Sequence, residues 1–141
     1  MGPLRVFADA NVLYSAALGG LSFELVWDLA KAQRVVLLTS GYCRVEAEHN
    51  LPRKHPVRLP LFAERLEHVS VVFSPQTETR AENPEAVALA DKDAPVYAAA
   101  VAVKAAVLLT GDCRHFGALM ARTDLPLRVR TVRDFLLELP S

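Results

Sequence analysis

Short apolar runs alternate along the chain with longer segments whose apolar residues recur at helical spacing. The runs at residues 4–8, 35–39, 69–73 and 107–109 are almost continuously apolar, and residues 127–131 predict a fifth strand at an edge. Continuous runs are typical of parallel strands that are buried on both faces of a sheet. The pattern therefore predicts an α/β fold, a three-layer α/β/α sandwich around a central parallel sheet of four to five strands.

Helices are predicted between these strands. Residues 21–33 carry apolar side chains at helical spacing, with Ser22 as the N-cap. Ser40 is expected to cap a helix that Pro52 ends near Leu51. Residues 94–106 are apolar almost all round, which is typical of a buried helix. The remaining expectations are a helix or turn at 11–17, a basic turn at 53–58, a loop at 74–84 and short helices at 60–68, 84–90, 115–122 and 132–139.

Composition and length narrow the class of protein. The 141 residues suit a single domain, 1–141, and a hydrophobic fraction of 52% is enough for a sizeable core. That fraction indicates either buried strands or an exposed apolar patch that meets a partner or a second copy. A formal net charge of zero argues against the strongly basic surface of a high-affinity DNA binder but does not exclude a nuclease.

The cysteines and the N-terminus bear on the cellular compartment. Cys43 and Cys113 are too few for a disulfide framework, and the spacing of Cys43, His49 and His55 does not fit a zinc site. The apolar stretch before Asp9 is too short for a signal peptide, and no apolar run approaches the ~20 residues of a membrane span. These features predict a cytoplasmic protein with no membrane segment.

Acidic residues fall where the predicted strands end. Asp9 directly follows the first strand, Asp112 follows the fourth, and Glu46 lies about two turns into the helix after the second. Asp91 and Asp93 precede the buried helix that leads into the fourth strand. Ligands of open parallel sheets bind at the carboxyl ends of the strands, so the topology can gather these acids at one edge.

Clustered carboxylates raise one another's pKa unless a cation offsets their charge. An all-oxygen site favours Mg²⁺ or Mn²⁺, and one or two such ions can activate water for phosphodiester hydrolysis. Each acid also has a structural interpretation. Asp9, Asp93 and Asp112 could cap turns or helices, and Glu46, like Glu48, could be solvated. The prediction of a metal site therefore rests on the joint pattern.

Three segments carry a family resemblance. FADANVLYSA, SGYCRVEAEHNL and DKDAPVYAAAVAVKAAVLLTGDCRHF resemble, in the same order, the motifs of PIN-domain proteins, in particular the small VapC-toxin-like ribonucleases. The resemblance covers nearly the whole chain, and its third segment is the most specific. It implies a PIN-like α/β/α fold, RNA hydrolysis dependent on Mg²⁺ or Mn²⁺, and, for many small members, a homodimeric toxin that a small antitoxin holds inactive.

Carried over by position, the resemblance assigns four groups of residues. The catalytic, metal-binding acids are Asp9, Glu46, Asp93 and Asp112, with Asp91 as an auxiliary ligand. Glu46 is preferred over Glu48 because a step of two residues points to another helix face. Asn11 and Thr110 orient carboxylates by hydrogen bonds. Lys92 departs from the family pattern and either weakens metal affinity or contacts phosphate.

Basic residues near these motifs are candidate RNA contacts or simply a solvated surface. They are Arg44, Arg53, Lys54, Arg58, Arg114 and His115. Two alternative functions stay open. A phosphatase of the haloacid dehalogenase type would need a second Asp at the position of Asn11. A catalytically inactive PIN-like scaffold that binds RNA or a protein would need no metal.

Overall fold

Five parallel strands form the centre of the molecule, in the order β3-β2-β1-β4-β5. The computed structural model describes residues 2–72 and 83–140. The strands are β1 (Leu4–Ala8), β2 (Val35–Ser40), β3 (Val69–Val72), β4 (Val107–Leu109) and β5 (Arg128–Arg130). This sheet confirms the predicted fold class, including the edge position of the fifth strand.

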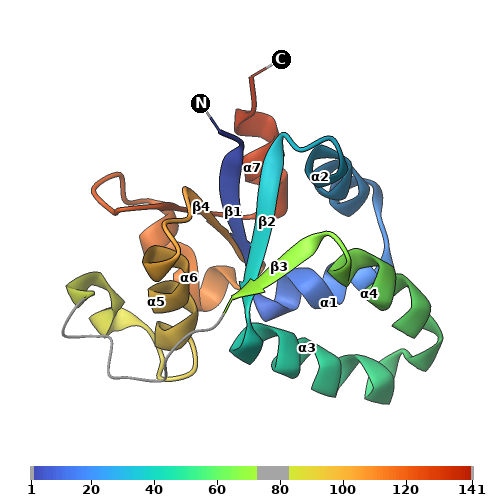
Figure 1. Ribbon diagram of the computed structural model, residues 1–141. Helices are drawn as coiled ribbons and strands as arrows, with labels where there is room; N and C mark the ends of the chain where they lie inside the picture. Colours follow the sequence, from blue (N-terminus) through green and yellow to red (C-terminus); the bar gives the residue numbers. More distant parts are fainter. Residues whose placement is uncertain (1, 73–82, 141) are drawn as a thin grey trace.

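Helices cover both faces of the sheet (Figure 1). They are α1 (Ala10–Leu18), α2 (Leu21–Lys31), α3 (Gly41–Lys54), α4 (Leu59–Leu66), α5 (Ala94–Ala102), α6 (Cys113–Met120) and α7 (Val132–Glu138), with 3-10 helices η1 (Pro56–Arg58) and η2 (Pro84–Ala88). Successive side chains along each strand point to opposite faces of the sheet and pack into two hydrophobic cores, one on each face. Val6 packs with α1, α2, α4 and α7, whereas Phe7 packs with α5 and α6. The three predicted layers follow from this alternation.

The order of the strands determines where a ligand can bind. The chain runs outward from β1 through β2 to β3, then returns to the other side of β1 to add β4 and β5. The carboxyl ends of β1 and β4 therefore meet at the point where the direction of winding reverses, the usual ligand position in such sheets. The Asp9 amide donates to the Leu109 carbonyl oxygen at 3.0 Å and ties the two ends together.

Several helix boundaries differ from the prediction, among them the start of α2 and the end of α3. Gly20, with φ of +118°, is the N-cap of α2, so Ser22 lies inside the helix and the prediction of a Ser22 cap is wrong. The left-handed backbone at Gly19 and Gly20 sets the start of the helix. Pro52 lies inside α3, which continues to Lys54. A proline in the last turn removes one hydrogen bond, and it does not end this helix.

The predicted buried helix is shorter than expected but is enclosed. Most of α5 is buried, and it ends at Ala102 because Lys104 adopts a left-handed φ of 57° that turns the chain into β4. The predicted loop at 74–84 lies mostly outside the described residues. In the part of the chain that is described, no single helix is long and apolar enough to cross a membrane, and α1 and α2 reach that length only as a pair bent by 107°.

Candidate active site

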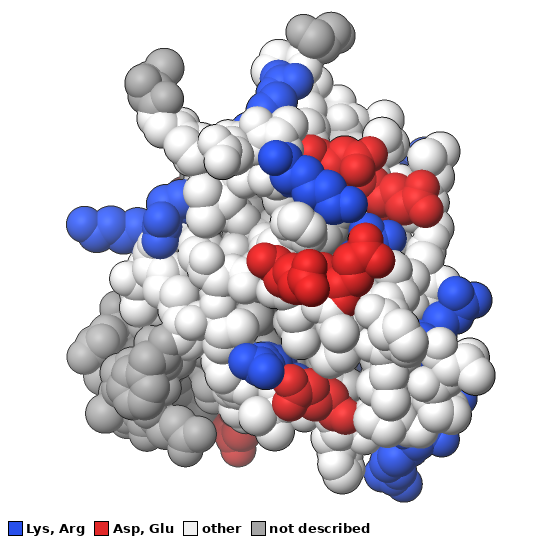
Figure 2. Space-filling view, turned by 45° about the vertical axis from the view of Figure 1, so that its right-hand side comes forward, with Lys and Arg blue, Asp and Glu red and all other residues white. Residues whose placement is uncertain are grey.

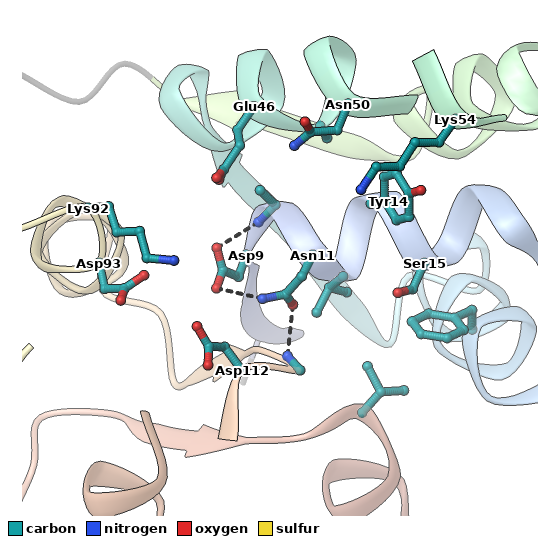
Figure 3. A pocket seen from close by; sticks show the side chains of 16 residues that line it. Asp9, Asn11, Tyr14, Ser15, Glu46, Asn50, Lys54, Lys92, Asp93 and Asp112 are labelled. Carbon is teal, nitrogen blue, oxygen red and sulfur yellow. Dashed lines mark hydrogen bonds between the residues drawn. The ribbon is translucent and has the colours of Figure 1, made fainter. Parts of the chain in front are cut away.

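A pocket of about 600 Å³ opens at the carboxyl edge of the sheet (Figure 3). Its lining includes four carboxylates from separate parts of the chain: Asp9 after β1, Glu46 on α3, Asp93 before α5 and Asp112 after β4. The structure thus brings together the four acids that the sequence singled out. Their service as metal ligands or catalysts stays a prediction.

Asp9 is buried at the bottom of this pocket, with 5% of its surface exposed. Its Oδ1 accepts a hydrogen bond from the Ala10 amide at 2.7 Å and thereby caps α1. Its Oδ2 accepts from the Thr110 hydroxyl at 2.8 Å and from the Asn11 side-chain amide at 3.2 Å. The capping role and the position in the pocket are therefore compatible, because the two oxygens face different partners.

Asn11 and Thr110 connect Asp9 to the loop that carries Asp112. The Thr110 hydroxyl oxygen accepts from the Asp112 amide at 3.1 Å and from the Asn11 side-chain amide at 3.2 Å. The Asn11 Oδ1 accepts from the Gly111 amide at 2.8 Å (Figure 3). This network holds the ends of β1 and β4 in a fixed relation and fixes the orientation of the Asp9 carboxylate.

The environment of Asp9 favours its neutral form. Burial raises the pKa of Asp9 to about 6, the negative charges of Glu46 and Asp93 add to this, and hydrogen bonds from Thr110 and Ala10 oppose it. Cys43 is buried beside Asp9, with its Sγ 3.9 Å from Oδ1, and burial raises the pKa of this thiol to about 12. A cation in the pocket would favour the ionised form of Asp9.

Asp112 is held by His115 one turn into α6. Its Oδ1 accepts from the His115 amide at 3.0 Å, and its Oδ2 lies 2.7 Å from the His115 Nδ1. Burial acts to raise the pKa of Asp112, but the hydrogen bonds from His115 outweigh it, and the pKa is lowered. Asp112 is therefore ionised and oriented before any ligand binds.

Asp93 is the least satisfied acid of the pocket. It is 7% exposed, and its buried Oδ2 has no hydrogen-bond partner among the described residues. The His115 Nδ1 lies 3.9 Å from that oxygen. Burial raises the pKa of Asp93, while Lys92 and His115 oppose the rise. A buried carboxylate oxygen without a donor is a costly arrangement that a bound cation would relieve.

These groups are close enough to share one cation. One ligand atom from each of Asp93, Asp112 and His115 lies within 4.8 Å of the others. Carboxylate oxygens suit hard divalent ions such as Mg²⁺ and Mn²⁺, and the imidazole is already engaged by Asp112. The residues present therefore fit a divalent ion bound mainly through oxygen.

The other acids and Lys92 occupy distinct positions. Glu48 pairs with Arg44 at 2.6 Å on the exposed side of α3, whereas Glu46 lines the pocket. Asp91 is exposed and is not among the described residues that line the pocket. Lys92 does line it, and Figure 3 shows its side chain extending past Asp93 toward Asp9.

The basic candidates separate into two sets. Lys54 lines the pocket, and His115 adjoins it through Asp112. Arg44 is paired with Glu48, Arg53 lies 3.5 Å from the His49 Nε2, and Arg58 and Arg114 are exposed; none of these four lines the pocket within the described structure. On the face that Figure 2 shows, the basic side chains are spread out and form no continuous stripe.

Sequence reasoning missed three polar residues of the pocket. Asn50 lies four residues after Glu46, with Lys54 another four beyond it, so all three share one face of α3. Tyr14 and Ser15 follow Asn11 by three and four residues on α1. Helical spacing from the predicted acids and their neighbours was the signal that could have found them.

Comparison with known proteins supports this description. A sequence model described as a PIN domain matches residues 5–114, a range that contains all four pocket acids. A search of curated proteins finds no match.

Solved structures share the fold at low sequence identity. VapBC2 from Rickettsia felis, bound to a DNA fragment from its promoter, matches with a TM-score of 0.68 and 15% identity over 91% of this chain and 98% of that one. DNA-bound VapBC from Salmonella typhimurium matches with a TM-score of 0.66 and 14% identity, over 92% of this chain and 98% of that one. VapC20 from Mycobacterium tuberculosis, a Sarcin-Ricin loop cleaving toxin, matches with a TM-score of 0.54 and 18% identity, over 80% of this chain and 94% of that one. Because the PIN-domain model matches well over half of the chain, and the fold agrees, this chain belongs to the PIN-domain family.

Proposed function

We propose that this protein is an endoribonuclease dependent on Mg²⁺ or Mn²⁺, with its centre in the pocket lined by Asp9, Glu46, Asp93 and Asp112. The observation that carries the proposal is the buried Oδ2 of Asp93, which lacks a donor in the described structure and faces Asp112 and His115. A divalent ion satisfies such an oxygen and offsets the gathered negative charge.

The residues of the pocket have separate tasks under this proposal. Asp93 and Asp112 would hold the ion, and Asp9 would bind it directly or through water. When bound, the ion supplies positive charge that polarises a phosphodiester and lowers the pKa of water. Thr110 and Asn11 hold the Asp9 carboxylate in place through their hydrogen bonds. Such pre-set orientation avoids reorganisation during the reaction.

Glu46 differs from the other three acids in being exposed on α3 while still lining the pocket. Figure 3 shows its carboxylate directed toward Asp9. We assign to its carboxylate oxygen the acceptance of a proton from the attacking water. Lys54, on the same face of α3, would bind an RNA phosphate beyond the cleaved bond.

We further propose that the protein acts in the cytoplasm as the toxin of a toxin–antitoxin pair and forms a homodimer. Two of the similar structures are VapBC complexes bound to DNA, and a third is a toxin. Exposed apolar side chains on α2 and α7 would suit a protein contact, namely Leu21 (71% exposed), Leu25 (45%) and Leu137 (71%). Light scattering that finds only monomers at micromolar concentration would count against the homodimer.

A pair of matched variants tests the nuclease. Glu46→Gln removes the carboxylate from the pocket, and Glu48→Gln removes an acid from the same helix outside it. With mixed RNA and Mn²⁺, we expect Glu46→Gln to slow cleavage by about 10²–10⁴-fold, the usual contribution of a proton acceptor, and Glu48→Gln to cleave normally. EDTA should stop all cleavage.

Other results would favour an alternative. Binding of RNA without cleavage by the wild type in either metal would support an inactive scaffold. Asn11 uses its amide in three hydrogen bonds that hold Asp9, Thr110 and Gly111, which differs from the general acid that a haloacid-dehalogenase-type phosphatase needs.

A further inference from the structure

Lys92 places a positive charge inside the acidic pocket. It lines the same pocket as the four acids, and Figure 3 shows its ammonium between Asp93 and Asp9. Among the described residues, no carboxylate oxygen lies within 4.0 Å of this ammonium, the distance that defines an ion pair. The charge therefore faces several carboxylates at once without being bound to one of them.

The backbone of Lys92 is held from two sides. The Asp93 amide donates to the Ala90 carbonyl oxygen at 2.9 Å and closes the turn that contains Lys92. From α3, the Tyr42 hydroxyl donates to the Lys92 carbonyl oxygen at 3.0 Å. Lys92 thus extends from a fixed point on the pocket rim.

The charge of Lys92 acts on the two acids that we assign to the metal. Lys92 lines the pocket together with Asp93 and Asp112, and one ligand atom from each of these two acids lies within 4.8 Å of the other. A positive charge in such a partly buried space offsets the repulsion between neighbouring carboxylates. The ammonium of Lys92 therefore does part of what a divalent ion would do for them.

We propose that the ammonium of Lys92 is the second cation of this pocket, so that the site takes one divalent ion where an all-acid pocket would take two. The inference rests on the proposed metal-dependent nuclease function. In two-ion sites the metals lie roughly 3.5–4 Å apart and together clamp the reacting phosphate. A tethered ammonium beside Asp93 repels a second ion, and as a compact charge it can contact a phosphate oxygen itself.

The number of bound ions tests this directly. The full chain is titrated with Mn²⁺, and free Mn²⁺ is followed by electron paramagnetic resonance. We expect one ion per wild-type chain and two per chain in Lys92→Met. Removal of a unit charge a few ångströms away should tighten the second ion by at least about tenfold. Lys92→Gln should behave like Lys92→Met, whereas Lys54→Met, which removes the other ammonium lining the pocket, should still bind one ion.

Two ions on the wild type, or a single ion on both Lys92 variants, would overturn the inference. Cleavage of RNA by the same preparations separates this failure from that of the proposed function. A wild type that cleaves with Mn²⁺ but binds two ions refutes only the role of Lys92. A wild type that neither binds Mn²⁺ nor cleaves RNA refutes both.

Discussion

Replacement of Thr110 by valine would remove the hydroxyl that joins Asp9, Asp112 and Asn11. Thr110 is fully buried, and its hydroxyl donates to Asp9 at 2.8 Å while accepting from the Asp112 amide and the Asn11 side chain. Valine keeps nearly the same shape, so the main losses are these hydrogen bonds. The hydrogen bond to Asp9 contributes to the free energy of unfolding by an amount that depends on pH, because the Asp9 carboxyl ionises.

The pKa of Asp9 sets the pH at which the cost changes. In the folded, metal-free protein burial raises the pKa of Asp9 to about 6, from its ordinary value of 3.8. The protonated form is therefore favoured by folding, and the associated stability is present below about pH 4 and lost as pH rises through 6. Folding at alkaline pH therefore costs about 3 kcal/mol more than it would if the pKa of Asp9 kept its ordinary value.

Thr110→Val should increase the stability that the protein loses as pH rises through 6. At pH 8 the variant lacks a hydrogen bond to an ionised carboxylate, which is worth about 1.5–3 kcal/mol. At pH 4.5 the same bond reaches a protonated Asp9 and is worth about 0.5–1.5 kcal/mol. We therefore expect the variant to be destabilised by about 1 kcal/mol more at pH 8 than at pH 4.5. A saturating divalent ion should weaken this pH dependence.

Urea denaturation in EDTA at the two pH values measures the effect, with Thr39→Val as the matched control. Thr39 is equally buried, on β2, but its hydroxyl donates at 2.8 Å to the Ala8 carbonyl oxygen, which does not titrate. Its cost should be the same at both pH values. An equal cost for Thr110→Val at pH 4.5 and 8, or a larger one at pH 4.5, would refute the assignment of a raised pKa to Asp9.

Two further predictions concern the rim of the pocket. Tyr42→Phe removes the hydrogen bond that fixes the Lys92 backbone, so we expect RNA cleavage to slow by about tenfold. The melting temperature should stay within a few degrees of the wild type. An unchanged cleavage rate would refute this anchoring role of Tyr42. Lys54→Met removes a proposed phosphate contact, so RNA affinity, measured by fluorescence anisotropy in EDTA, should weaken evenly across sequences. The slope of the logarithm of the binding constant against the logarithm of the salt concentration should become shallower by roughly 0.7. Arg44→Met, outside the pocket, should leave that slope unchanged.

The sheet and the approximate place of the site were predictable because both follow from local pattern. Continuous apolar runs indicated buried parallel strands, and Asp9 and Asp112 stand directly after two of them. Strand order 3-2-1-4-5 then brings those two ends together. Residues that follow strand ends in a parallel sheet need no knowledge of side-chain packing to be placed at the same edge.

The finer geometry depends on contacts between distant residues and was not predictable. The sequence shows Lys92 between two aspartates, but its direction depends on a turn at Ala90–Asp93 and on a hydroxyl from Tyr42, 50 residues away. The contribution of Asn50 requires knowing that α3 crosses the carboxyl edge of the sheet. The boundary of α2 was missed because the backbone at Gly20 outweighed the capping preference of Ser22.

Anomalous diffraction from crystals soaked in Mn²⁺ tests the central claim most directly. The claim is that the carboxylates of this pocket bind a divalent cation, with the otherwise unpartnered oxygen of Asp93 among the ligands. The account predicts an anomalous peak in the pocket, bonded to Asp93 and to at least one of Asp9 and Asp112, which disappears in Asp93→Asn crystals. A pocket without a peak at saturating Mn²⁺, or a peak that persists unchanged in Asp93→Asn, would contradict it.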